Sequence, residues 1–186
     1  MAITVPQILK FAPGSQKVAD IVVKNFNEYA DKYEVNTPLR ISAFLAQLIH
    51  ESNSFKNTRE IWGPTKAQTR YEGRKDLGNI FPGDGARFKG RGLIQITGRT
   101  NYAAVSKALT GKENTFLDNP DLLSIYPFAM TSAFWFWTGR NLNRYADIQY
   151  FETITKRING GLNGFAERIE IYNRINKEFG LPIYKP

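Results

Sequence analysis

The sequence predicts a mainly α-helical protein that forms one globular domain over residues 1–186, with a long glycine-rich loop region. Apolar side chains recur at helical spacing in several segments. The chain has 186 residues with 42% apolar and 13% aromatic content, which fills one core but not two sizeable ones. Residues 52–92 lose this periodicity and contain seven glycines. A loop region of that length in a compact domain is usually functional.

Two helices are expected before the loop region. Residues 15–34 carry apolar side chains at helical spacing, with Ser15 as the expected N-cap. In the second helix Thr37 suits the cap and Pro38 suits the first helical position. After the loop region "LIQIT" is read as a short strand or extended segment. Further helices are expected over residues 99–109, 126–142, 150–158 and 165–179.

The net charge of +8 is unevenly distributed along the chain. Residues 1–55 carry five Lys or Arg and five Asp or Glu, and residues 113–186 carry eight of each. Residues 56–112 carry twelve basic and four acidic residues, so the whole excess lies there. Such a local bias indicates an anionic partner, although a basic face that only keeps the protein soluble is an open alternative.

Several protein classes are excluded by composition. The chain has no cysteine, so it has neither disulfides nor thiolate chemistry. Its N-terminus lacks the basic and apolar blocks of a secretory signal, and no segment reaches the length of a membrane span. We therefore expect a protein that is made in a cytoplasm and has no stable membrane insertion.

An acidic residue falls on the apolar side of the second helix. In "LAQLIHESNSF", residues 45–55, Glu51 follows Leu48 by three positions and continues the buried stripe. Partial burial disfavours an ionised carboxylate, and a carboxylic acid that keeps its proton is what a general acid for glycosidic cleavage requires. If the helix frays before Glu51, the side chain only reaches water. His50, the single histidine, has no catalytic partner at a telling spacing and is interpreted as structural.

Hydrolysis of a glycosidic bond usually takes a second carboxylate. The candidates that follow are Glu60, Glu72, Asp76 and Asp84. In a continuous helix Glu60 would lie about 13 Å from Glu51, on the opposite face. The two can share a site only if the helix stops near residues 52–54, whose Ser-Asn-Ser sequence competes for backbone hydrogen bonds.

Three segments resemble glycoside hydrolase family 19, the chitinase and endolysin family with a lysozyme-like helical fold and a substrate groove. "HES" at residues 50–52 with Glu60 resembles its acid-containing helix and second carboxylate. "FKGRGLIQITGRTNY", residues 88–102, is similar to its groove segment, and "INGGLNGFAERIEIYNRI", residues 158–175, resembles its C-terminal groove element and helix. The matches follow the family order and span most of the chain.

The resemblance implies a role for each matching residue. Glu51 would protonate the leaving oxygen, and Glu60 would be the general base that activates water on the opposite face of the sugar, an inverting mechanism. Thr97 would help to hold that water. The sugar subsites would be lined by Gln95, Asn101, Tyr102, Asn159 and Arg168. No metal and no cofactor are implied.

The lack of a signal peptide, the basic charge and "WGPTKAQTRYEGRKDLGN", residues 62–79, resemble the phage and prophage endolysins of the family more than the plant chitinases. This resemblance implies a monomeric muramidase (lysozyme) that cleaves peptidoglycan glycan strands and lyses the host cell. It also implies one catalytic domain without a wall-binding module, and a separate holin that releases the enzyme from the host cytoplasm. Plant members carry an acidic residue near the position of Asn163, so a charge network around Arg168, and with it a chitin preference, stays open.

The sequence leaves three other functions to compare with this one. A chitinase is the nearest alternative, but chitin is uncharged and leaves the basic excess unexplained. A nucleic-acid-binding protein would use the basic segment with Tyr71, Phe81 and Phe88 for stacking, but no recognised nucleic-acid motif is present. A membrane-active protein is disfavoured, because residues 164–179 hold three positive and three negative charges.

Overall fold

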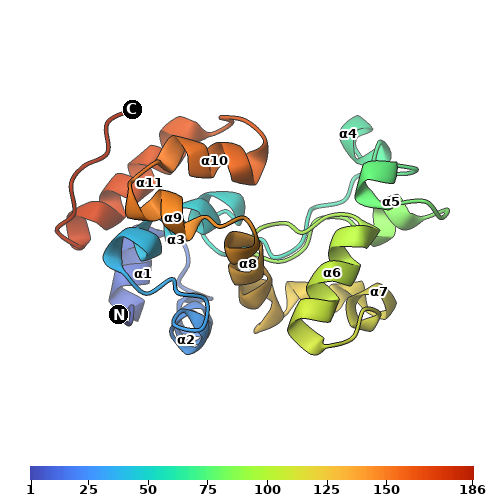
Figure 1. Ribbon diagram of the computed structural model, residues 1–186, viewed down its shortest axis with the longest axis horizontal. Helices are drawn as coiled ribbons and strands as arrows, with labels where there is room; N and C mark the ends of the chain where they lie inside the picture. The colour runs from blue at the N-terminus through green and yellow to red at the C-terminus, as the bar shows by residue number, and fades with distance from the viewer. The chain divides into compact units, whose positions relative to one another are not determined.

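The computed structural model describes residues 1–186 and is mainly α-helical, as predicted (Figure 1). In chain order the helices are α1 (Val5–Phe11), α2 (Ala19–Tyr29), α3 (Pro38–Glu51), α4 (Lys66–Thr69), η1 (Lys75–Leu77), α5 (Asp84–Arg87), α6 (Arg99–Thr110), α7 (Thr115–Asp118), η2 (Pro120–Ser124), α8 (Phe128–Gly139), α9 (Asn143–Asp147), α10 (Phe151–Asn159) and α11 (Phe165–Glu178). None of them is both long and apolar enough to span a lipid bilayer.

The chain divides into two compact units, and the division falls within α8. Unit 1 comprises Met1–Lys56 and Phe136–Pro186, and unit 2 comprises Asn57–Trp135. The single catalytic domain expected over residues 1–186 stays a prediction. "LIQIT" does not form a strand, because the β contacts are limited to two isolated bridges, of Arg91 with Arg59 and with Ile96.

Helix α3 begins and ends as the sequence predicted. The Thr37 hydroxyl accepts a hydrogen bond from the Arg40 amide (3.3 Å), and Pro38 occupies the first turn. At the other end the Ser52 hydroxyl donates to the carbonyl of Leu48 (2.6 Å) and accepts from the amide of Phe55 (2.9 Å).

Three consecutive residues then leave the helical region. Asn53, Ser54 and Phe55 have φ values of 50°, 60° and 64°, a left-handed conformation that is costly for residues other than glycine. The Phe55 side chain is buried, and this burial of apolar surface offsets the backbone strain. The predicted stop of the helix between Glu51 and Glu60 is therefore confirmed.

The first long helix is shorter than the sequence predicted. Helix α2 starts at Ala19, and Ser15 is not its N-cap, because its buried hydroxyl has no hydrogen-bond partner. The Ser15 carbonyl instead accepts from the amide of Val18 in a turn that precedes the helix (2.8 Å). Helices α6, α8, α10 and α11 fall within or close to the expected ranges.

Aromatic side chains form much of the core of unit 1. The Phe44 ring is fully buried and meets the edge of Trp137 at a centroid distance of 5.3 Å. The Trp137 indole donates to the Asn143 side chain (2.7 Å), so its one polar atom is satisfied. Helix α3 packs along α11. On α11 the Tyr172 ring stacks on the ring of Phe151, the first residue of α10, at a centroid distance of 4.1 Å.

Unit 2 has a separate apolar core around α6, α7 and η2. Phe88 meets Tyr102 at 5.1 Å, and Phe116 meets Phe128 at 4.9 Å, both edge to face. Leu123 of η2 is also fully buried. Each unit therefore supplies its own rigid support for the functional residues that it carries.

Replacement of Phe44 tests the unit 1 core. Phe44→Ala removes a fully buried ring and leaves a cavity beside Trp137, so the free energy of unfolding should fall by about 3–5 kcal/mol. Urea unfolding followed by circular dichroism measures the loss. Ile21→Ala, at a position 42% exposed on α2, is the control and should change it by about 0.5 kcal/mol or less. Equal losses in the two variants would contradict the assigned core.

Candidate active site

Glu51 is the last residue of α3 and contacts a buried arginine of α11. The Arg168 Nη2 donates to the Glu51 Oε1 at 2.5 Å. The Arg168 side chain is 2% exposed and that of Glu51 20% exposed. Glu51 therefore stays on the protein surface with one oxygen held, while its Oε2 makes no hydrogen bond within the protein.

The guanidinium of Arg168 is fixed from three directions. Its Nη1 donates to the Gln47 side chain at 2.5 Å, and its Nε donates to the carbonyl of Asn163 at 3.4 Å. Gln47 lies one helical turn before Glu51 and in turn donates to the Thr155 hydroxyl (2.9 Å). Since buried charges need paired and hydrogen-bonded partners, this network sets the position of Glu51.

Asn159 joins the same part of unit 1. It ends α10, and its Nδ2 donates to the carbonyl of Asn163 (2.9 Å), the acceptor that Arg168 also uses. Its Oδ1 is buried and has no hydrogen-bond partner within the protein. The structure thus links Glu51, Arg168 and Asn159, which lie far apart in the sequence.

His50 packs beneath this region. Its Nδ1 lies 3.0 Å from a carboxylate oxygen of Glu167, and burial together with the charge of Arg168 lowers the pKa of the imidazole. Gly164 has φ +70°, and a Cβ there would lie 2.4 Å from the His50 ring. Glycine at position 164 therefore lets the start of α11 approach the end of α3.

Glu60 is held in unit 2 by neutral donors. Its Oε2 accepts from the Gly90 amide (2.9 Å), and its Oε1 accepts from the side chains of Gln68 (3.0 Å) and Tyr71 (3.3 Å). The Glu60 amide also donates to the Gly90 carbonyl (2.9 Å). Three donors thus contact the two carboxylate oxygens and set the position of Glu60.

Gly90 brings Gln95 to the same place. A Cβ at position 90 would lie 2.6 Å from the Gln95 Oε1 and 3.3 Å from the Glu60 Oε2, so a larger residue there would displace the Gln95 side chain. Gln95 has φ +55°, and its Nε2 donates to the carbonyl of Gly92 (2.9 Å). The strained turn therefore places the Gln95 side chain close to Gly90, next to the carboxylate of Glu60.

Thr97 and Asn101 follow on the next turn. The Thr97 hydroxyl donates to the Gln95 carbonyl (3.0 Å), which leaves its oxygen able to accept a hydrogen bond from a ligand. The Asn101 side chain donates to the Thr97 carbonyl (2.7 Å). Both side chains are partly exposed.

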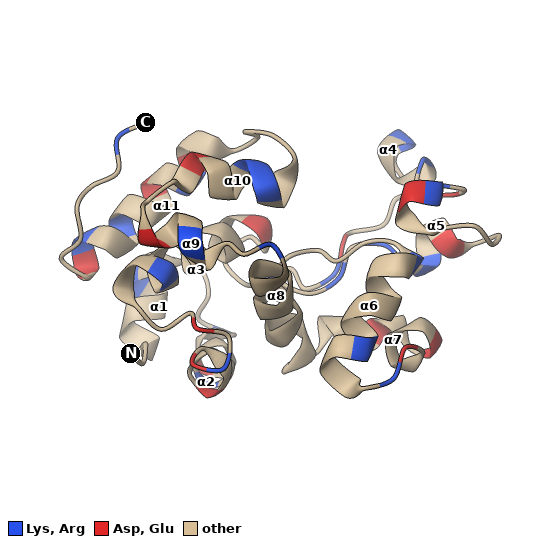
Figure 2. Cartoon of the chain, in the orientation of Figure 1, with Lys and Arg blue, Asp and Glu red and all other residues tan.

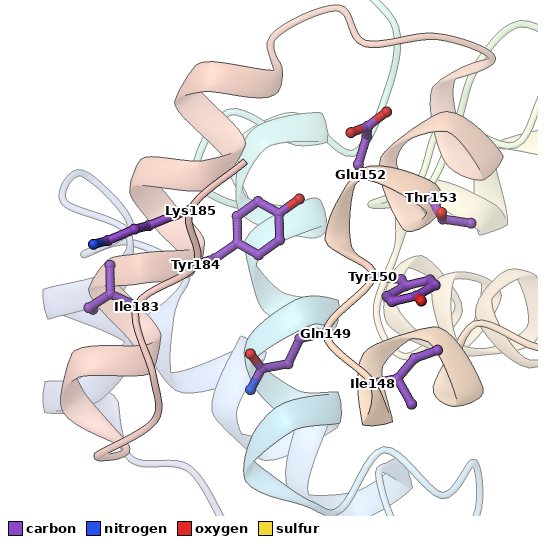
Figure 3. Close-up of a pocket in the computed structure, with 8 residues that line it drawn as sticks. All are labelled: Ile148, Gln149, Tyr150, Glu152, Thr153, Ile183, Tyr184 and Lys185. Atoms are coloured by element: carbon purple, nitrogen blue, oxygen red, sulfur yellow. The ribbon is translucent and has the colours of Figure 1, made fainter.

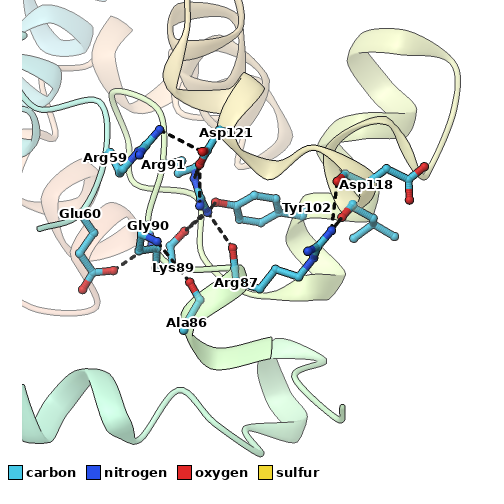
Figure 4. A network of polar contacts seen from close by, with 11 residues as sticks. Arg59, Glu60, Ala86, Arg87, Lys89, Gly90, Arg91, Tyr102, Asp118 and Asp121 are labelled. Carbon is cyan, nitrogen blue, oxygen red and sulfur yellow. Dashed lines mark hydrogen bonds and ion pairs between the residues drawn. The ribbon is translucent and has the colours of Figure 1, made fainter. Parts of the chain in front are cut away.

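Tyr102 differs from the expectation that it lines a sugar subsite. It is fully buried, and its hydroxyl donates to the Lys89 carbonyl (2.6 Å) and accepts from the Arg91 guanidinium (2.8 Å) (Figure 4). Burial raises the pKa of the Tyr102 phenol. In this structure the ring offers no face to a sugar, and its role is to support residues 89–91 from below.

Sequence analysis missed Arg91, which organises this network. Arg91 is 3% exposed, and its Nε donates to Asp121 (2.9 Å), which also pairs with Arg59 at 3.2 Å (Figure 4). Its Nη1 donates to the Arg87 carbonyl (2.8 Å). In the sequence, the position of Arg91 between two glycines and just before an apolar segment could have indicated that it is buried.

Trp62 was also missed. It lies two residues after Glu60, with its ring 6.1 Å from that of Tyr71 and 5.7 Å from the Lys89 ammonium. A partly exposed indole beside a held carboxylate offers a flat apolar face to a sugar. A tryptophan within the glycine-rich segment was the signal that could have found it.

A buried ion pair stabilises the loop that carries Gly90, Gln95 and Thr97. Asp84, 2% exposed in α5, accepts from the Nε (2.8 Å) and Nη2 (2.6 Å) of Arg99 at the start of α6. The Arg99 guanidinium keeps the pKa of Asp84 below its ordinary value of 3.8.

The chain has no group of three His, Cys, Asp or Glu side chains that could hold a metal ion.

Each unit thus presents one held carboxyl group with hydrogen-bonding side chains around it. Unit 1 offers Glu51 with Asn159, and unit 2 offers Glu60 with Gln95 and Thr97. Glycoside hydrolases typically act through two carboxyl groups of this kind, and the amide and hydroxyl side chains beside them can bind sugars.

The comparisons with known proteins agree with this chemistry. Residues 19–149 match the glycoside hydrolase 19 family, described as chitinase class I, and the chain belongs to that family. A family 19 domain-containing protein of Haemophilus influenzae is 34% identical over 160 residues, which cover 71% of this chain and 76% of that protein. The chain is therefore a glycoside hydrolase of chitinase type.

Plant and bacterial chitinases extend the comparison. An endochitinase of Arabidopsis thaliana is 36% identical over 137 residues, which cover 73% of this chain but only 44% of that protein. Chitinase C from Streptomyces griseus HUT6037 has the same fold, with a TM-score of 0.74 at 20% identity over 99% of this chain and 79% of its own. The lysozyme-like helical fold expected from the resemblance is thereby confirmed.

Replacement of Asp84 tests the ion pair that supports the loop. Asp84→Asn should lower the free energy of unfolding by about 1–3 kcal/mol at pH 7, because Arg99 loses its charged partner. Since folding depresses the Asp84 pKa, the stabilisation is present above pH 3.8 and is lost as the pH falls through the folded-state value. Urea unfolding at pH 7 and pH 3 should therefore show a difference that shrinks in acid. A difference that grows in acid would contradict the pairing.

Proposed function

We propose that this glycoside hydrolase cleaves the glycan strands of bacterial peptidoglycan by an inverting mechanism, as a lysozyme of muramidase type. Two carboxyl groups with fixed positions support the assignment as a hydrolase. Glu51 accepts a hydrogen bond from Arg168, and Glu60 accepts one from the Gly90 amide. Their surroundings differ: Glu51 contacts a guanidinium, whereas Glu60 contacts only neutral hydrogen-bond donors.

In the proposed reaction Glu51 protonates the glycosidic oxygen through the Oε2 that the protein leaves free. Glu60 takes a proton from water, and the oxygen of that water attacks the anomeric carbon from the opposite face, which inverts it. The Thr97 hydroxyl accepts the second hydrogen of the water, since its own proton is directed to the Gln95 carbonyl. Gln95, Asn101 and Asn159 hydrogen-bond the hydroxyl and acetamido groups of the sugars.

The choice of peptidoglycan rests on charge. Peptidoglycan carries lactyl and peptide carboxylates, and the basic excess lies in residues 56–112. Figure 2 shows Lys and Arg recurring through the segment that carries α4 and α5. Several of these residues are used in ion pairs, but Lys66, Arg70 and Lys75 are exposed and form none. They are free to attract an anionic polymer.

Hydrolysis of chitin is the second candidate. The family description and the names of the plant and bacterial relatives favour it directly. The same two carboxyl groups would act on it, because both polymers contain β-linked N-acetylated sugars. A charge dependence would then be absent, since chitin is neutral.

A non-enzymatic nucleic-acid-binding role has less support. Of the three aromatic residues expected to stack on bases, Phe88 is fully buried and the Tyr71 hydroxyl is bonded to Glu60. Phe81 is 55% exposed, but the Arg99 guanidinium lies 4.8 Å from its ring centre. A row of free stacking faces along a basic groove, which such binding needs, is not available.

The proposal extends to a biological setting. We infer a phage or prophage endolysin that is made in the host cytoplasm, acts as a monomer on the cell wall and depends on a separate holin for release. The resemblance of residues 62–79 to endolysins and the basic excess support this setting. It predicts that the purified protein lyses bacterial cells only when it is given access to the wall.

Replacement of Glu51 tests the assignment of the acid. Glu51→Gln keeps the shape but removes the transferable proton, so hydrolysis should fall by at least about 100-fold, while circular dichroism shows an intact fold. Glu170→Gln, an exposed position on α11, is the matched control and should retain activity. A folded Glu51→Gln protein with the unmodified rate would remove Glu51 from the mechanism.

Product analysis separates the two substrates. Mass spectrometry of sacculi digests should show new reducing ends on N-acetylmuramic acid. Ends on N-acetylglucosamine would mean a glucosaminidase, and release from chitin alone would mean a chitinase. Proton NMR of the first product should show an inverted anomer, whereas a retained anomer would exclude the water-activating role of Glu60.

Charge reversal tests the role of the basic segment. Lys66→Glu with Lys75→Glu should slow the lysis of sacculi several-fold, and more at low salt, where screening is weak. The matched control, Lys17→Glu with Lys24→Glu, makes the same change of charge at exposed positions in unit 1. Equal losses in the two double variants would show that the basic segment has no special role.

A further inference from the structure

A pocket lies in unit 1, between the connection from α9 to α10 and the C-terminal segment after α11 (Figure 3). Its volume is about 510 Å³, within the range of small-ligand sites. It is lined by Ile148, Gln149, Tyr150, Glu152, Thr153, Ile183, Tyr184 and Lys185. None of these residues belongs to the candidate active site, and the proposed reaction does not use them.

The pocket combines exposed apolar surface with two aromatic rings. Tyr150 is 58% exposed, and Ile148 and Ile183 are about equally so, at 56% and 50%. Figure 3 shows Tyr184 on the C-terminal segment and Tyr150 just before α10, with Gln149 below and between them. Exposed apolar surface gathered around a pocket marks a binding site more often than isolated exposed residues do.

One wall of the pocket is fixed before any ligand binds. The Tyr184 amide donates to the Asn173 side chain (2.8 Å), which donates back to the Tyr184 carbonyl (3.0 Å). The Tyr184 ring meets the rings of Phe151 and Tyr172 edge to face, at 5.9 and 6.0 Å. The aromatic face is therefore held by α11 and the core, and little ordering is needed on binding.

The floor of the pocket carries polar groups without partners. Gln149 has φ +57°, a strained conformation for a residue other than glycine, and its side-chain amide has no hydrogen-bond partner within the protein. The Thr153 hydroxyl is similarly free. One carboxylate oxygen of Glu152 accepts a hydrogen bond from the Lys156 ammonium (2.6 Å), and the other oxygen has no partner within the protein. The lining holds one acidic and one basic residue, Glu152 and Lys185, so the pocket has no strong net charge and favours a neutral ligand with several hydrogen-bonding groups.

We propose that this pocket is a non-catalytic glycan-binding site that takes one N-acetylated hexosamine unit of the polymer. A sugar ring has an apolar face for Tyr150 or Tyr184, and its acetamido and hydroxyl groups match the free amide of Gln149 and the hydroxyl of Thr153. The proposal rests on that part of the proposed function that peptidoglycan and chitin share, a polymer of N-acetylated sugars. A second contact on the same polymer raises the effective concentration of the catalytic groups.

Titration by NMR tests the site in the unmodified full-length chain. N-acetylglucosamine, which has no bond to cleave, should shift the backbone amide signals of residues 148–153 and 183–185. Glucose, which lacks the acetamido group, should shift them less at the same concentration. No shift in these two segments at concentrations that shift residues 90–101 would overturn the proposal, because the sugar would then bind only at the candidate active site.

A variant tests whether the site matters for polymers. Tyr150→Ala removes an exposed ring, so co-sedimentation with insoluble chitin and with sacculi should weaken about threefold to tenfold. Loss on one polymer alone would identify the one that the pocket prefers. Ile21→Ala is the control for removal of an exposed apolar side chain from unit 1, and the melting temperature of both variants should stay that of the unmodified chain.

Unchanged binding of Tyr150→Ala to both polymers would overturn the proposal. If the variant instead loses its fold, the titration of the unmodified chain decides alone. Failure of the proposed function is seen separately: a chain whose pocket binds N-acetylglucosamine but that releases no muropeptides from sacculi would refute peptidoglycan hydrolysis and leave the pocket assignment intact.

Discussion

In unit 1 the contacts of one buried guanidinium join helix α3 to helix α11. Arg168 is 2% exposed, and an uncompensated charge at that depth would be strongly destabilising. Its compensation comes from Glu51 and Gln47 on α3 and from the carbonyl of Asn163 in the loop before α11. The pairing of α3 with α11 and the position of the catalytic acid candidate are therefore consequences of the same requirement. The close approach at Gly164 makes it sterically feasible.

The carboxyl group in unit 2 is held by a different device. Glu60 contacts no cation through its carboxylate; a backbone amide, a primary amide and a phenol surround it. These donors are themselves fixed, because Gly90 is followed directly by Arg91, which is buried on Asp121. One carboxyl group therefore faces a permanent charge and the other only dipoles. The two carboxyl groups are thus positioned by different kinds of contact, one by an ion pair and the other by neutral hydrogen bonds.

Local signals in the sequence were sufficient for much of the fold. The Thr37–Pro38 start of α3 and its stop after Glu51 follow from capping and from the Ser-Asn-Ser sequence that follows, and both are present in the structure. The position of Glu51 on the apolar stripe likewise predicted partial burial. Ser15 was assigned wrongly as a cap, because a serine before an apolar run carries the same local signal whether or not the helix begins there.

The sequence by itself determined which carboxyl groups are available, and its Ser-Asn-Ser run favoured a helix stop between Glu51 and Glu60. Only the tertiary structure decided what holds them. Arg168 is 117 positions from Glu51 in the chain, and Gly90 is 30 positions from Glu60, so no periodicity or capping signal links either pair. Tyr102 shows the same limit, since a tyrosine that faces a groove and one buried beneath it look identical in sequence. Such distinctions depend on which distant side chains and backbone groups meet, and that is fixed by packing alone.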